Sequence, residues 1–205
     1  KIYHFRVEGK DYLVYADRYR LYILDRKGKE RVKVSTLLNL SANTSLYLTK
    51  QNGQMKIVFT DANGEIVLVN FRGQVEQIKG EEMIGGGMFN VEDVNNDGQS
   101  EFIYALKNRV LVMDNKGKLL FEKHWEGSEL DFPYVYRFST RDSRIGMMDG
   151  KGGRLFLLDM KDVSKGFPIR GNSPFSIAFG GKGSAGFYLF AGSAGTHLLK
   201  YRVLR

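Results

Sequence analysis

Apolar residues in this chain come in short runs separated by turns. Runs such as "LYIL", "IVLV", "FIYAL" and "VLVM" are apolar at successive positions, which predicts strands buried on both faces. Segments such as "ERVKV" and "VEQIKG" follow some of them, and their alternating charges are typical of an exposed edge strand. No segment keeps a 3.6-residue periodicity long enough for a helix pair, which excludes helical solenoids. The pattern therefore predicts an all-β protein with many short strands.

This pattern recurs along the chain with a nearly constant period. Each copy has short apolar strands, then a tight turn that begins with Asp or Asn, then a more polar strand. The turn residues are Asp25, Asn70, Asp114 and Asp159, and successive ones are 45, 44 and 45 residues apart. In the third copy we predict strands at roughly 87–94, 100–106, 109–115 and 119–125. Four-stranded units of this period indicate the blades of a β-propeller, and a β-sandwich built from the same hairpins is the weaker alternative.

We expect about five four-stranded antiparallel blades in a single β-propeller domain. Their approximate bounds are 1–40, 41–83, 84–130, 131–172 and 173–205. The last copy ends after its third strand, and the chain begins directly with a first strand, so no spare strand is left to complete that blade. We therefore favour the C-terminal part of a larger propeller over a five-bladed ring that closes without the missing strand.

Composition and charge narrow the range of partners. The 24 Gly and 3 Pro among 205 residues fit frequent tight turns. The net charge is +8, and the basic residues near the N-terminus alternate with Tyr and Leu, which indicates solvated strand faces rather than a nucleic-acid-binding arm. We therefore expect no nucleic-acid partner. No apolar stretch approaches the ~18 residues of a membrane span, and the absence of Cys excludes disulfides and thiol catalysis.

Two segments resemble a known group of propellers. The segment "DVNNDGQSEFIYALKNRVLVMDNKGKLLFE" resembles the repeats of integrin-α-like (FG-GAP/VCBS-type) and related quinoprotein-like bacterial propellers. "KGFPIRGNSPFSIAF" is similar to the Gly-Phe-Pro connection between such blades. The literal Phe-Gly and Gly-Ala-Pro signatures and the Trp-containing repeats of quinone-dependent dehydrogenases are absent. The resemblance therefore implies the architecture and an extracytoplasmic location, in the periplasm or at the cell surface, rather than an activity.

One turn carries a candidate metal site. Its oxygen donors are Asp93, Asn95, Asp97, the carbonyl of Gln99, and Glu101, with Gly98 at the bend. This alternation of donors suits Ca²⁺, and the resemblance implies that the same loop holds a structural Ca²⁺. The alternative is an Asx-turn without an ion, in which these side chains accept backbone N–H groups. In the second copy Leu48 and Lys50 stand where Asp93 and Asn95 lie, so the ligand set occurs only once.

The segment at 126–136 is longer than the other connections and combines acidic with aromatic residues. Its candidate ligand-binding residues are Glu129, Asp131, Phe132, Tyr134 and Tyr136. Inserted loops on one face of a propeller are frequent binding sites. The alternative interpretation is that these aromatic residues pack between blades.

Catalytic motifs are absent, so we expect no enzymatic activity. The three histidines, His4, His124 and His197, fall on different blades, and no nucleophile elbow, Walker loop or His-Glu-x-x-His motif is present. The sequence therefore favours a non-enzymatic binding or scaffold module, an extracytoplasmic bacterial β-propeller with a protein partner. The alternative function is carbohydrate binding or processing through exposed aromatic residues and carboxylates.

Overall fold

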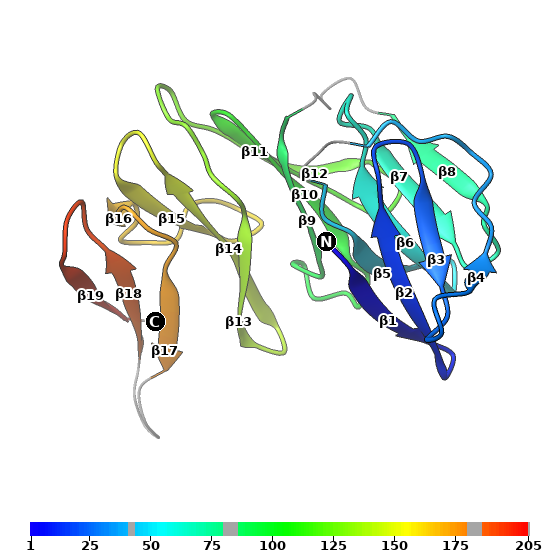
Figure 1. Ribbon diagram of the computed structural model, residues 1–205. Helices are drawn as coiled ribbons and strands as arrows, with labels where there is room; N and C mark the ends of the chain where they lie inside the picture. Colours follow the sequence, from blue (N-terminus) through cyan, green and yellow to red (C-terminus); the bar gives the residue numbers. More distant parts are fainter. Residues whose placement is uncertain (41–43, 80–85, 180–185, 205) are drawn as a thin grey trace.

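The structure is a computed structural model that describes residues 1–40, 44–79, 86–179 and 186–204. Within these ranges the chain forms nineteen strands in five antiparallel sheets, and no helix. The sheets follow one another in chain order, and the first and last lie on opposite sides of the view in Figure 1. The prediction of an all-β chain is confirmed.

Each sheet is built from consecutive strands. The first contains β1 (Tyr3–Val7), β2 (Lys10–Ala16), β3 (Leu21–Leu24) and β4 (Glu30–Val32). The second contains β5 (Tyr47–Gln51), β6 (Gln54–Thr60), β7 (Ile66–Asn70) and β8 (Val75–Ile78). The third contains β9 (Met88–Glu92), β10 (Glu101–Leu106), β11 (Arg109–Met113) and β12 (Leu119–His124). The fourth contains β13 (Tyr134–Ser139), β14 (Asp142–Asp149), β15 (Arg154–Leu158) and β16 (Ile169–Arg170), and the fifth contains β17 (Ser176–Phe179), β18 (Gly186–Gly192) and β19 (Leu198–Leu204).

These strands agree closely with the repeat in the sequence. In the third sheet, all four strands lie within one residue or so of the predicted ranges at their starts. The fifth sheet has three strands in the described part of the chain, as its shortened copy predicts.

The turn before the fourth strand has the same geometry in successive sheets. The Oδ1 atom of Asp25 accepts hydrogen bonds from the N–H groups two and four residues later, and Asn70 and Asp114 do the same. In each of these turns the glycine three residues on has a positive φ, between 77° and 86°. Gly73 has a second reason to be glycine, because a Cβ there would lie 2.1 Å from the carbonyl oxygen of Lys33. The same local hydrogen-bond pattern therefore recurs at the period that the sequence shows.

The core consists of four separate apolar layers, one between each pair of successive sheets. The first layer packs Val14 and Ile23 of the first sheet against residues such as Phe59 of the second. The next three layers join the second to the third sheet, the third to the fourth, and the fourth to the fifth. In the inner sheets the middle strands are therefore covered on both faces, which explains their continuous apolar runs.

Hydrogen bonds from polar side chains on the first strands also join neighbouring sheets. The hydroxyl of Tyr47 on β5 donates to the carbonyl of Phe89 on β9, at 2.7 Å. The amide of Asn90 on β9 donates to the carbonyl of Pro133, at 2.8 Å, just before β13. These two bonds join the second sheet to the third, and the third sheet to the start of the fourth, next to the two candidate sites. Among the described residues, none belongs to a helix with the length and hydropathy that a membrane span requires.

Candidate functional site

The candidate metal loop is the turn between β9 and β10, at residues 93–100. The carboxylate of Asp93 accepts hydrogen bonds from the N–H groups of Asp97 and Gly98, at 3.2 and 3.1 Å. Asn95 Oδ1 also accepts from the Asp97 N–H, at 2.8 Å. Gly98 has φ +87° and Asn96 has φ +63°, and both are residue types that tolerate this region. The backbone geometry predicted for the Asx-turn is therefore present.

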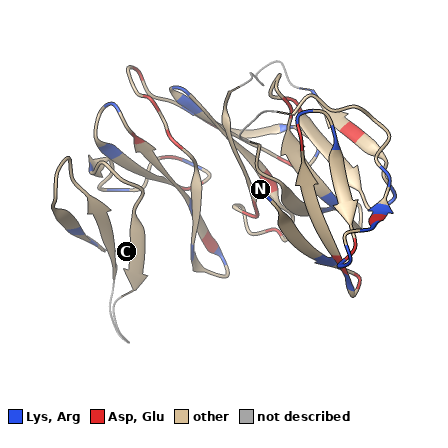
Figure 2. Ribbon diagram, viewed as in Figure 1, with Lys and Arg blue, Asp and Glu red and all other residues tan. Residues whose placement is uncertain are grey.

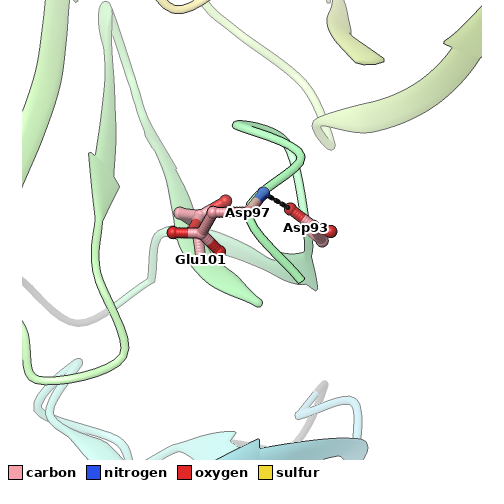
Figure 3. A group of neighbouring side chains, drawn as sticks. All are labelled: Asp93, Asp97 and Glu101. Carbon is pink, nitrogen blue, oxygen red and sulfur yellow. Dashed lines mark hydrogen bonds between the residues drawn. The ribbon is translucent and has the colours of Figure 1, made fainter. Parts of the chain in front are cut away.

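Three carboxylates converge in this loop. Oxygen atoms of Asp93, Asp97 and Glu101 all lie within 4.8 Å of one another. Figure 3 shows the side chains of Asp97 and Glu101 beside each other, with Asp93 reaching the backbone N–H of Asp97. No ion pair from Lys, Arg or His to these three carboxylates is found among the described residues. Their mutual repulsion is therefore not offset by a basic side chain there.

Glu101 is the buried member of this group. Glu101 is only 2% exposed, and its Oε2 accepts hydrogen bonds from the N–H groups of Val94 and Asn95, at 2.9 and 3.2 Å. Burial raises the pKa of the Glu101 carboxyl above its ordinary value, and these two hydrogen bonds oppose the rise. The charges of Asp97 and Asp93 raise the pKa of Glu101 further. A bound cation would favour the ionised form of this carboxyl.

The remaining two predicted donors have polar partners that position them. The Nδ2 of Asn95 donates to Asp97 Oδ2 at 3.1 Å, and the Gln99 N–H donates to Asp97 Oδ1 at 2.7 Å. The side-chain oxygen of Gln99 accepts from Asn115 at 2.7 Å, which leaves its main-chain carbonyl as the predicted donor. The donor set of carboxylate, amide and carbonyl oxygens fits the chemistry that Ca²⁺ prefers.

The loop also connects three sheets. Ser143 of the fourth sheet donates a hydrogen bond to the side-chain oxygen of Asn96, at 2.8 Å. Gln51 of the second sheet donates from its side chain to the carbonyl of Asn115, the residue that holds Gln99. An ion in this loop would therefore stiffen a junction between sheets rather than only one turn.

The second candidate region, predicted at residues 126–136, lies between the third and fourth sheets, and its part at residues 126–134 is anchored by its backbone. The N–H of Leu130 donates to the carbonyl of Lys107, and the N–H of Asp131 donates to that of Met148, at 2.6 and 2.8 Å. The carbonyl of Glu129 accepts from the N–H of Gly150, at 3.1 Å. The segment is therefore held to both neighbouring sheets.

Four of the five predicted ligand-binding residues belong to this segment, and two of them are in contact. Tyr134 is 40% exposed, and its ring makes an edge contact with the half-buried ring of Phe132 at a centroid distance of 5.2 Å. Glu129 is exposed and Asp131 is half-buried, with its Oδ1 accepting from the Phe132 N–H at 2.7 Å. The segment thus holds one aromatic pair and two carboxylates on a fixed backbone.

Tyr136 has a different position from the other four. Its ring stacks on Phe175, just before β17 of the fifth sheet, at a centroid distance of 4.8 Å, and its hydroxyl donates to the Phe175 carbonyl. Burial raises the pKa of its hydroxyl strongly above the ordinary value for tyrosine. Tyr136 therefore contributes to the packing between the fourth and fifth sheets.

Asp149 holds this segment in place, and the sequence analysis did not identify it. Its fully buried carboxylate accepts the N–H groups of Glu129 and Gly152, each at 3.0 Å, and pairs with Arg154 at 2.7 Å. Burial alone would raise the pKa of Asp149, but the hydrogen bonds from Glu129, Arg154 and Gly152 hold it below the ordinary value. The available signal was its place at the end of a second strand, which is also the position of Asp61 in the second sheet.

A cavity that the sequence did not indicate lies between the first and second sheets. It has a volume of about 590 Å³, and its lining includes Tyr3, Asp17, Arg18 and Thr44. These residues are far apart in the chain and carry no motif, so only packing brings them together.

Comparison with known proteins agrees with this architecture. No protein-family model and no curated protein sequence matches the chain. Solved structures do match it. The Vibrio cholerae biofilm matrix protein Bap1 has a TM-score of 0.59 at 16% identity, over 89% of this chain and 31% of Bap1. The chain has a β-propeller fold.

Two other propellers have similar scores. BBS1N, solved in complex with ARL6DN, has a TM-score of 0.56 at 10% identity, over 80% of this chain and 52% of that chain. BamB from Moraxella catarrhalis has a TM-score of 0.51 at 15% identity, over 98% of this chain and 63% of BamB. The propeller described here thus spans less than two thirds of the length of each of these proteins, and at such low identity the likeness concerns the fold.

Proposed function

We propose that this propeller is a non-enzymatic, extracytoplasmic scaffold that binds a protein partner through residues 126–134. The observation that carries the proposal is the exposed ring of Tyr134 in contact with the half-buried ring of Phe132, on a backbone segment that also carries Glu129 and Asp131 and is fixed to two sheets. Aromatic side chains that are held rigid are effective anchors in protein interfaces, because little conformational freedom is lost on binding. The structure of BBS1N with ARL6DN provides a precedent for partner binding by a protein of this fold.

Capture of the partner tests this proposal. The immobilised propeller is exposed to a periplasmic and cell-surface extract of its source organism, and retained proteins are identified by mass spectrometry. We expect a partner that is retained by the wild type and lost with the double variant Phe132→Ala/Tyr134→Ala. Tyr19→Ala is the matched control, because Tyr19 is an exposed tyrosine of the first sheet and should leave binding unchanged. Equal retention by both variants would contradict the proposal.

Carbohydrate binding is the second candidate function. It is supported by the solvent-exposed ring of Tyr134 next to Asp131, since sugars stack on aromatic rings and donate hydrogen bonds to carboxylates. A glycan array separates the two functions: saturable binding to one glycan that is lost with Tyr134→Ala would favour carbohydrate over a protein partner.

The loop at 93–101 would hold a structural Ca²⁺ in this proposal. Asp93, Asn95, Asp97 and Glu101 would bind it through side-chain oxygens, and Gln99 through its carbonyl. The ion would neutralise the three carboxylates and stiffen the junction between the sheets that the loop connects. This role also supports an extracytoplasmic location, as the resemblance of the loop to bacterial propellers implies.

A further inference from the structure

The junction between the second and third sheets contains a network of buried polar side chains. Figure 2 shows charged positions mainly in turns and near strand ends. Lys56 differs from these, because it lies within β6 and is only 4% exposed. Its Nζ donates to both carboxylate oxygens of Glu76 on β8, at 2.8 and 2.7 Å, and to Oε1 of Gln51 on β5, at 2.7 Å. Three hydrogen bonds therefore offset the burial of this ammonium group.

Gln51 connects this ammonium group to the third sheet. Its Nε2 donates to the main-chain carbonyl of Asn115, in the turn between β11 and β12, and both residues are 7% exposed. An ammonium group can only donate and a carbonyl oxygen can only accept. Only one orientation of the Gln51 amide therefore satisfies both partners, and in that orientation the side chain joins the second sheet to the third.

The network ends at the candidate metal loop. The Nδ2 of Asn115 donates to the side-chain oxygen of Gln99, at 2.7 Å. Gln99 is exposed, and a glutamine in such a position ordinarily keeps much of its rotamer freedom. Here its N–H also donates to Asp97 Oδ1, at 2.7 Å, so the side chain and the backbone are both held. The main-chain carbonyl of Gln99, the predicted donor to Ca²⁺, is thus connected to the second sheet through buried hydrogen bonds.

The first and second sheets meet through apolar residues at the equivalent positions of the repeat. These positions lie 44 residues before Gln51, Lys56 and Asn115, and they are occupied by Val7, Tyr12 and Phe71. Val7 and Tyr12 are buried, and the ring of Tyr12 contacts that of Phe71 at a centroid distance of 4.5 Å. The fold therefore does not require polar residues here. Buried polar groups are costly unless they are paired, and in this chain the polar set stands at the junction beside the loop at 93–101.

We propose that Gln51 and Asn115 are positioning residues for Ca²⁺, which hold the carbonyl of Gln99 in place without contacting the ion. Hydrogen-bond partners of metal ligands typically change metal affinity about 10- to 100-fold. The inference rests on the proposed structural Ca²⁺ and adds that the second sheet determines how tightly the loop binds it. Ca²⁺ in turn stabilises the junction between the two sheets, because coupling between two sites is reciprocal.

Isothermal titration calorimetry of the full chain with CaCl₂ tests this inference. Gln51→Met keeps the length of the side chain but removes both of its hydrogen bonds, and we expect it to weaken Ca²⁺ binding about tenfold or more. Asn115→Ala should weaken binding to a similar extent. The double variant should weaken it by less than the product of the two single effects, because both residues act through one network.

Tyr47→Phe is the matched control. It removes another hydrogen bond from β5 to the third sheet, the one to the carbonyl of Phe89, which is not part of the network. Thermal melts in chelator check that each variant is folded, and both Tyr47→Phe and Gln51→Met should lower Tm there because both loosen the same junction. Only Gln51→Met should also raise the Kd for Ca²⁺, which separates positioning of the loop from general stabilisation of the sheets.

Three results would overturn the inference. These are a wild-type Kd in Gln51→Met or Asn115→Ala, equal weakening by Tyr47→Phe, and fully independent effects in the double variant. A wild type that binds no Ca²⁺ would instead show that the loop is a plain turn, and the proposed structural ion would fail together with this inference. None of these results bears on the partner proposed for residues 126–134, which the capture experiment tests separately.

Discussion

The second and fifth sheets have the same order in their first three strands but different surroundings. In the second sheet, the neighbouring residues Ile57 and Val58 point to opposite faces, and both have 0% exposure because a sheet lies on each side. In the fifth sheet, Phe187 is 1% exposed, whereas its neighbour Tyr188 is only half-buried. A propeller strand is therefore buried at successive positions only where it has two neighbouring sheets.

The outer face of the first sheet combines apolar and charged residues. Its residues Leu13, Tyr15, Tyr22 and Leu24 face away from the second sheet and are half-buried. The rings of Tyr15 and Tyr22 stack at a centroid distance of 4.7 Å. Arg6 and Asp11 lie on the same face, and Asp11 forms an ion pair with Arg26.

The largest expected effect separates the two faces of β18. Phe187→Ala should lower the free energy of unfolding by about 3–5 kcal/mol, because it leaves a cavity in the layer between the fourth and fifth sheets. Tyr188→Ala should cost about 1 kcal/mol or less, because one side of this ring is open to solvent. Urea unfolding measures both values. Equal losses would mean that another sheet or chain covers the outer face.

The next effect concerns the buried anchor of residues 126–134. Asp149→Asn should lower stability by about 2–4 kcal/mol, because it removes the charge that pairs with Arg154 and disturbs the hydrogen bonds to two backbone N–H groups. The pKa of Asp149 is lowered in the folded state, so its stabilisation is present above the ordinary pKa of aspartate, about 3.9, and is lost as pH falls through the lowered value. Melting curves from pH 7 to pH 2 should therefore converge for the wild type and Asp149→Asn. Curves that stay parallel would assign the loss to packing instead.

An intermediate effect is expected from Ca²⁺. At a free concentration of about 100 times Kd, a structural ion adds about 2.7 kcal/mol, which corresponds to a rise in Tm of about 5–10 °C for a chain of this size. Differential scanning calorimetry in Ca²⁺ and in chelator measures the rise, and Asp97→Ala should abolish it. Asp114→Ala is the control, since it removes a turn carboxylate of the same sheet that lies outside the cluster. It should lower Tm in both buffers and keep the difference between them.

The smallest effect concerns the two exposed basic residues of β19, and it tests whether they contribute to stability. Lys200→Ala/Arg202→Ala should change the free energy of unfolding by no more than about 0.5 kcal/mol, as is usual for exposed side chains. Leu21→Ala, on the equivalent face of the first sheet, should cost about 2–5 kcal/mol. Chemical denaturation of the two variants side by side gives the comparison. A large loss for the basic pair would place these side chains in an intramolecular interface.

Much of the candidate metal loop could be predicted from the sequence. Its turn forms from hydrogen bonds between Asp93, Asn95 and backbone N–H groups within five residues, so local spacing is sufficient. The burial of Glu101 was not predicted, because it depends on the sheets around β10. The aromatic segment at 126–136 was found from its length and composition, but the attachment of residues 126–134 through Asp149 was not.

The sequence by itself determined the strands, their order, the repeat of about 45 residues and the turns between them. These features depend on side-chain alternation and on short-range hydrogen bonds such as those of Asp25 and Asn70. Only the tertiary structure decided that Tyr136 packs on Phe175 while Tyr134 faces solvent. It also decided which faces of the sheets are covered. Contacts between residues 39 or more positions apart depend on how whole sheets pack, and that packing has no local signature in the chain.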